Sequence, residues 1–96
     1  MGIRENKVEA YLDAEVKKLG GLTRKWVCPS HCGVPDRIVL IKRVTMFVEV
    51  KTDDGRLSPM QEREIDRLTS MGARVRVIYG YQGVDELIEE LKNELR

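Results

Sequence analysis

Apolar residues near the start of the chain recur at the three- and four-residue steps of an amphipathic helix: Val8, Leu12, Val16 and Leu19. Asn6 followed by Glu9 has the spacing of a capping box, which would begin this helix, and Gly20-Gly21 would end it. The segment therefore predicts one helix with a single apolar face.

The next part of the chain has the composition of β-strands. Thr23 to Cys28 predicts a short strand, and the Pro and Gly residues of Pro29 to Pro35 predict a loop. Arg37 to Ile41 and Met46 to Lys51 are rich in Val and Ile, and the polar pair Lys42-Arg43 lies between them. This pattern predicts an antiparallel hairpin.

The C-terminal part predicts a helix, a strand and a closing helix. Ser58 to Gln61 (SPMQ) supplies an N-cap Ser, a first-turn Pro and a Gln at the third helical position. Ile65, Leu68 and Met71 are expected to form the buried stripe of that helix. From Arg74 to Tyr79, charged residues alternate with Val and Ile, as they do in a half-buried strand. The closing helix has its apolar residues at helical spacing: Val84, Leu87, Ile88, Leu91 and Leu95.

The elements follow the order α-β-β-β-α-β-α without repeats or a linker. Residues 1–96 are therefore expected to form one α/β domain, a central mixed sheet flanked by helices. A chain this short buries only about 60–65% of its unfolded surface, so a dimer interface would add to a thin core.

The apolar runs are far shorter than the ~20 residues that cross a bilayer, and no signal sequence is recognisable. Two cysteines are too few for a disulfide framework, which suits the cytoplasm.

The charges are unevenly distributed although the net charge is only +1. Residues 1–51 contain 10 Lys and Arg against 6 Asp and Glu, net +4, whereas residues 52–96 contain 7 against 10, net −3. A basic half is consistent with contact to phosphate, but a solvated mixed surface explains the same distribution equally well.

The candidate chemistry lies on the predicted hairpin. Asp36 precedes its first strand, while Glu49 and Lys51 lie two residues apart on the second strand and share a face. A turn at Lys42-Arg43 places residues numbered in the high thirties opposite residues numbered in the high forties. The carboxylates of Asp36 and Glu49 should therefore lie close together. A cation relieves their repulsion, and a pair of oxygen ligands with open positions suits Mg²⁺ or Mn²⁺.

A lysine beside two carboxylates is the combination expected for phosphodiester hydrolysis. Lys51 would stabilise negative charge on an attacked phosphate and favour a deprotonated attacking water. The simpler alternative is that Glu49 and Lys51 form an exposed strand face over a core of Val48 and Val50, and an isolated Glu-x-Lys favours that alternative. The Pro35-Asp36 pair one strand earlier favours the site.

Three short blocks lie in order along the chain: GVPDR at Gly33–Arg37, FVEVK at Phe47–Lys51 and LSPMQ at Leu57–Gln61. With Lys25 upstream, they resemble the VRR-NUC family, the virus-type replication-repair nuclease branch of the PD-(D/E)xK superfamily. The resemblance runs from the first helix to the strand ending near Tyr79. It implies a restriction-endonuclease-like fold and a domain of phage or prophage type.

The resemblance assigns roles to the candidate residues. It implies that Asp36 and Glu49 ligate the divalent metal, that the Val50 carbonyl helps, and that Lys51 is the catalytic lysine. Glu9 matches an acidic residue that reaches the metal directly or through water. The capping box with Asn6 is the alternative use of Glu9. No organic cofactor is implied.

For three further polar residues, the sequence allows two roles each. Gln61 matches a glutamine beside the catalytic lysine, and it can also cap its own helix. Lys25 and Arg37 flank the site and are candidates for contact with DNA phosphates, against an even chance that they are ordinary solvated cations.

Cys28, His31 and Cys32 are all potential zinc ligands. They offer three ligands where a structural zinc site normally takes four, and the sequence contains no other Cys or His. A zinc site is therefore not expected unless it bridges two subunits. His31 would otherwise act near the scissile phosphate or simply be exposed.

The sequence thus predicts a metal-dependent, structure-selective DNA endonuclease. No segment resembles a recognition helix, so selection should depend on DNA shape, and the family implies Holliday-junction-like branched DNA cut by a homodimer. Two alternatives are a less selective nuclease acting on flaps, ends or single strands, and a non-catalytic DNA-binding subunit of a repair complex.

Overall fold

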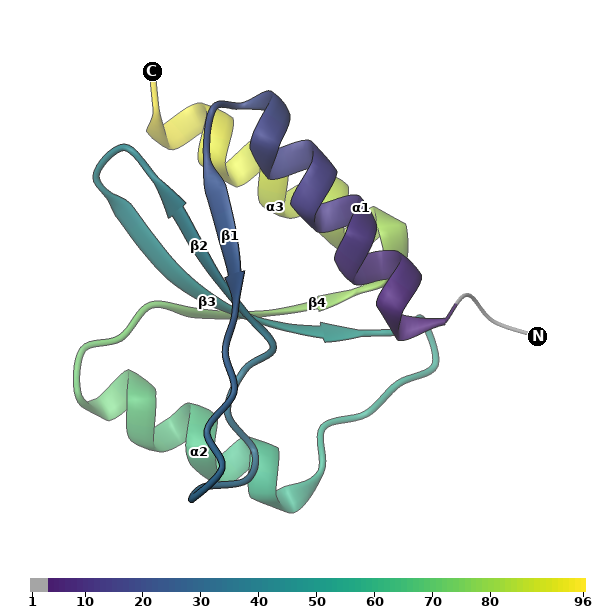
Figure 1. Ribbon diagram of the computed structural model, residues 1–96, viewed down its shortest axis with the longest axis vertical. Coiled ribbons are helices and arrows are strands. Elements are labelled where there is room, and N and C mark those ends of the chain that lie inside the picture. Colours follow the sequence, from purple (N-terminus) through teal and green to yellow (C-terminus); the bar gives the residue numbers. More distant parts are fainter. Residues whose placement is uncertain (1–3) are drawn as a thin grey trace.

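The computed structural model describes residues 4–96 and has the predicted order of elements (Figure 1). Along the chain these are α1 (Glu5–Lys18), β1 (Leu22–Lys25), β2 (Arg37–Ile41), β3 (Val44–Lys51), α2 (Pro59–Ser70), β4 (Val75–Tyr79) and α3 (Gly80–Glu94). No helix in this part of the chain is long and apolar enough to cross a membrane.

The strands form one mixed sheet in the order β1-β2-β3-β4. β1, β2 and β3 are antiparallel neighbours, and β4 pairs with β3 in parallel. The predicted hairpin is confirmed: Ile41 lies opposite Val44, Arg37 lies opposite Val48, and Lys42-Arg43 forms the turn. The register of β2 and β3 decides which side chains meet at the candidate site.

The core lies where α1 and α3 pack against each other and the sheet. The apolar face predicted for the first helix is confirmed, because Val8, Leu12 and Val16 are all 0% exposed. β2 and β3 contribute Val39, Met46, Val48 and Val50, and α3 contributes the stripe predicted for the closing helix: Val84, Leu87, Ile88 and Leu91.

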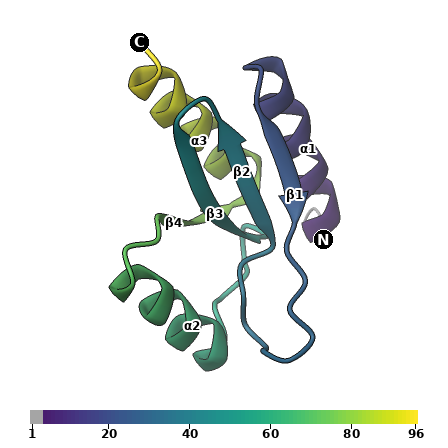
Figure 2. The same cartoon turned by 60° about the vertical axis from the view of Figure 1, so that its left-hand side comes forward.

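α2 lies apart from the other two helices, next to the loop that joins β1 to β2 (Figure 2). Gly33 of this loop approaches the α2 backbone so closely that an added Cβ would lie 2.8 Å from the Met60 carbonyl oxygen. His31 Nε2 is 2.8 Å from Glu64 Oε1. The loop that leads to Asp36 is therefore fastened to α2.

Three local predictions are wrong. α1 begins at Glu5 with Arg4 as N-cap and no side-chain cap bond, so Asn6 lies inside the first turn and forms no capping box with Glu9. The first strand is shorter than predicted and ends at Lys25. The stripe predicted for α2 is not buried: Met71, just after the helix, is 85% exposed, Ile65 and Leu68 are half-buried, and Glu64 is the buried residue of α2.

Candidate active site

The hairpin register brings Asp36 and Glu49 together. Because Arg37 lies opposite Val48, continuing the antiparallel register by one residue places Asp36 opposite Glu49. The backbone N–H of Val50 donates a hydrogen bond of 2.9 Å to Asp36 Oδ2, which holds the Asp36 carboxylate against β3.

Glu49 is a buried carboxylate with one oxygen left free. Its exposed fraction is only 1%. Oε2 accepts a hydrogen bond of 3.0 Å from Gln61 Nε2 and lies 3.7 Å from Lys51 Nζ. Oε1 is buried without a hydrogen-bond partner among residues 4–96. Burial, followed by repulsion from Asp36, raises the pKa of Glu49 to about 8. A buried unpartnered carboxylate oxygen is costly, and a cation would satisfy it.

The capping role predicted for Gln61 is confirmed, and the same side chain also contacts Glu49. Its side-chain Oε1 accepts from the Ser58 backbone N–H at 2.9 Å, and its own backbone N–H donates to Ser58 Oγ at 3.1 Å, which completes the capping box. The remaining amide nitrogen binds Glu49. The N-terminus of α2 and the buried carboxylate of β3 are therefore joined by one side chain.

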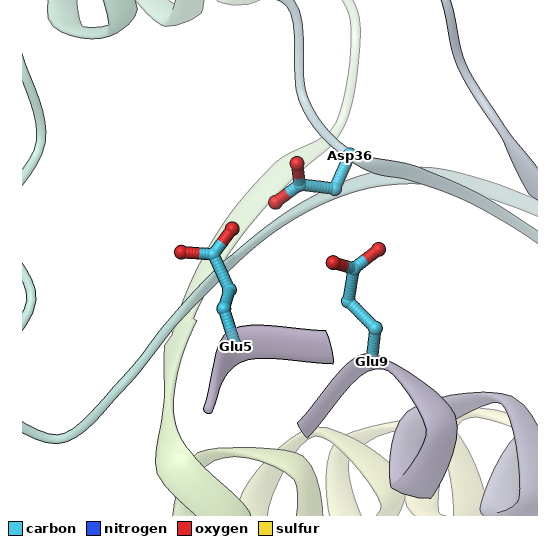
Figure 3. A group of neighbouring side chains, drawn as sticks. All are labelled: Glu5, Glu9 and Asp36. Atoms are coloured by element: carbon cyan, nitrogen blue, oxygen red, sulfur yellow. The ribbon is translucent and has the colours of Figure 1, made fainter. Parts of the chain in front are cut away.

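A second group of acids converges on Asp36 from α1. Carboxylate oxygens of Glu5, Glu9 and Asp36 lie within 4.8 Å of one another (Figure 3). Burial raises the pKa of both glutamates, and repulsion from Asp36 adds to the shift in each. Lys51 lowers the pKa of Glu5, so this charge also lies within electrostatic reach of the group.

The residues present fit a divalent metal ion. Asp36 belongs to the group with Glu5 and Glu9. Glu49 lies outside that group, but burial and then repulsion from Asp36 and Glu5 raise its pKa, so Glu49 lies within electrostatic reach of these acids. The donors are all oxygen, which hard cations such as Mg²⁺ and Mn²⁺ prefer, and Oε1 of Glu49 is a buried oxygen with no hydrogen-bond partner in residues 4–96.

A family model described as the VRR-NUC domain matches residues 6–82 of this chain. The chain belongs to the VRR-NUC family. This confirms the resemblance seen in the sequence, and the matched region includes Glu9, Asp36, Glu49, Lys51 and Gln61.

Individual relatives agree with this assignment. The VRR-NUC domain is 42% identical over 77 residues to "Putative nuclease p44" of Acyrthosiphon pisum secondary endosymbiont phage 1, an alignment covering 79% of this chain and 83% of the relative. A solved structure described as "VRR_NUC domain" superposes with a TM-score of 0.80 at 36% identity, covering 88% of this chain and 94% of the other. A second, "VRR_NUC domain protein", has a TM-score of 0.75 at 21% identity over 93% and 88% of the two chains, which shows the shared fold.

The two basic residues beside the site of this VRR-NUC domain differ in their surroundings. Lys25, at the end of β1, is exposed, and its charge lowers the pKa of Glu9. Arg37 is only 16% exposed and is engaged by carboxylates of α1, with NH1 3.4 Å from Glu9 Oε1 and further bonds to Asp13. Arg37 is thus tied into the protein, whereas Lys25 faces solvent.

Reasoning from the sequence missed Glu5 and Asp13. Both lie on the α1 face that carries Glu9, at steps of four residues, and this Glu-Glu-Asp row was a visible signal. The predicted start of the helix at Asn6 concealed it, because Glu5 then fell outside the helix. His31, for which a role at the phosphate was considered, contacts Glu64 of α2 instead.

Proposed function

We propose that this VRR-NUC domain is a divalent-metal-dependent, structure-selective endonuclease that hydrolyses phosphodiester bonds in Holliday-junction-like branched DNA. The observation that carries the proposal is the buried Glu49 carboxylate, which faces Asp36, lies beside Lys51 and has an Oε1 with no hydrogen-bond partner in the described part of the chain. A structural acid would be expected to have both oxygens satisfied.

Mg²⁺ or Mn²⁺ would be held by Asp36 and Glu49, with the Val50 carbonyl and Glu9, and Glu5 is added to this set by its place in the acidic group. When bound, such an ion supplies Lewis-acid polarisation of the phosphate and lowers the pKa of a bound water.

The chain's own residues supply the remaining functions. Lys51 holds a positive charge within 3.7 Å of Glu49 Oε2, on a side chain only 12% exposed, and stabilises the negative charge that develops on the attacked phosphate. Gln61 holds Oε2 of Glu49 and so directs Oε1 towards the metal position. Lys25 contacts a DNA phosphate at the rim of the site.

Selection of branched DNA is proposed on the basis of shape. Residues 4–96 form only the sheet and three helices, and none of these elements extends from the domain as a recognition helix would. Two copies in a homodimer would place two sites on one junction and give paired cuts, and the interface would add to the thin core. Because the phage relative is named a nuclease, we place the activity in the cytoplasm of a bacterium or a phage-infected cell.

The test is cleavage of labelled four-way junction, flap, duplex and single-stranded DNA with Mg²⁺, Mn²⁺ or chelator. Lys51→Ala removes the proposed catalytic lysine, and Lys92→Ala, an exposed lysine on α3, is the matched control. Metal-dependent paired nicks in the junction, lost only in Lys51→Ala, would support the proposal. Cutting of every substrate would favour the less selective nuclease, and a bound but uncut junction would favour the DNA-binding subunit.

A further inference from the structure

Arg37 points its guanidinium at α1, although it directly follows Asp36 on the chain. Its Nε and NH2 donate to the two carboxylate oxygens of Asp13 at 3.1 and 3.2 Å. Its NH1 lies 3.4 Å from Glu9 Oε1. All three guanidinium nitrogens therefore face carboxylates of one helix, and the pairing with Asp13 has the two-pronged geometry that fixes an arginine in direction.

Asp13 is itself anchored to the sheet. Thr23 Oγ1 on β1 donates a hydrogen bond of 2.8 Å to Asp13 Oδ1, the oxygen that also receives Arg37 Nε. Asp13 is 34% exposed and Arg37 16% exposed, so the pair is partly shielded from water. β1, β2 and α1 are thus joined at one point, one helical turn beyond Glu9.

Glu9 needs such a restraint because its neighbours repel it. Its carboxylate lies within 4.8 Å of those of Glu5 and Asp36, and this like-charge repulsion pushes the start of α1 away from the sheet. Arg37 is the cation in direct contact with Glu9, and it lowers the pKa of that carboxyl. This contact is made to Oε1 of Glu9, and a carboxylate oxygen of Glu9 lies within 4.8 Å of those of Glu5 and Asp36.

We propose that Arg37, fixed by Asp13, is a positioning residue that holds Glu9 in the metal site and does not contact DNA. The inference rests on the proposed function, since it assumes a divalent ion among these acids. It replaces the sequence-based assignment of Arg37 to DNA phosphates, while Lys25 keeps that assignment. Residues that orient metal ligands typically change metal affinity by about 10–100-fold when altered.

The variants Arg37→Gln and Asp13→Asn test this, with Mn²⁺ binding measured by calorimetry without DNA. The first removes a positive charge near the site and the second removes a negative charge, so a purely electrostatic effect would strengthen binding in one and weaken it in the other. The positioning role predicts weakening in both, by about tenfold. Glu15→Gln, an acid on the same helix that pairs with Lys18, is the charge-matched control for Asp13→Asn and should change little.

Junction binding in chelator, measured across a range of salt concentrations, separates positioning from DNA contact. We expect Arg37→Gln to keep the wild-type salt dependence, and Lys25→Gln to lower its slope by about one. A lowered slope in Arg37→Gln with unchanged Mn²⁺ affinity would overturn the inference while leaving the proposed function intact. A wild-type protein that neither binds Mn²⁺ nor cleaves DNA would overturn both. If Arg37→Gln does not fold, Arg37→Lys, which keeps the positive charge but loses the two-pronged pairing with Asp13, carries the metal test, and unchanged Mn²⁺ affinity in that variant would overturn the inference.

Discussion

Replacing Glu49 by Gln should stabilise the metal-free protein, and the gain should appear only at higher pH. The pKa of Glu49 is raised to about 8 by burial and by repulsion from Asp36, from an ordinary value of 4.5. The folded protein therefore binds more protons than the unfolded chain between these values. The contribution of Glu49 to stability is fully present below about pH 4.5 and is lost as the pH rises through about 8.

The size of this effect follows from the pKa difference. One pKa unit corresponds to about 1.4 kcal/mol, so ionising Glu49 between pH 5 and 8.5 should cost the wild type up to about 4 kcal/mol. Such a loss is large against the roughly 5–15 kcal/mol that stabilises a domain. The attraction of Lys51 is already contained in the raised pKa, and the hydrogen bond from Gln61 to Oε2 reduces the cost further, so we expect about 2–4 kcal/mol.

The assay is urea unfolding of wild type and Glu49→Gln in chelator at pH 5 and at pH 8.5. At each pH, the free energy of unfolding of the wild type is subtracted from that of Glu49→Gln. The change in this difference between pH 5 and pH 8.5 contains no pH-independent effect of the amide and reports the ionisation of Glu49. Glu89→Gln, an exposed acid on α3, serves as the control for a change of one charge. Equal pH dependence in wild type and Glu49→Gln would refute the reasoning that Glu49 is a strained, buried acid in the metal-free protein.

Three further predictions concern the same site. Lys51→Ala should abolish cleavage and leave junction binding, measured by fluorescence anisotropy, largely intact; an active purified mutant would exclude Lys51 as the catalytic lysine. Gln61→Ala loses both a cap bond and its contact with Glu49, so it should cost about 1–2 kcal/mol in thermal unfolding and also lower kcat. Ser58→Ala, which loses the cap but keeps the glutamine, should cost about 1 kcal/mol and largely retain kcat. Glu5→Gln should weaken Mn²⁺ binding several-fold by calorimetry, and unchanged affinity would remove Glu5 from the ligand set.

Two capping patterns with the same spacing had different outcomes. Ser58 to Gln61 formed the predicted capping box, because Pro59 suits the first helical position and disfavours helical geometry at Ser58. Asn6 and Glu9 have the same spacing but lie inside α1, since Arg4 is the residue with extended backbone geometry. The capping pattern therefore predicted the helix start correctly where a proline followed the N-cap residue and incorrectly where none did.

The sequence by itself determined the order of elements, the apolar faces of α1 and α3, and the meeting of Asp36 with Glu49. These follow from periodicity and from a two-residue turn, which fixes the register of adjacent strands. Only the tertiary structure decided that Glu5 joins the acids, that Arg37 is held by Asp13, and that Oε1 of Glu49 has no hydrogen-bond partner among residues 4–96. Those contacts depend on how α1 and α2 are placed against the sheet, and that placement is decided by packing between segments far apart in the chain.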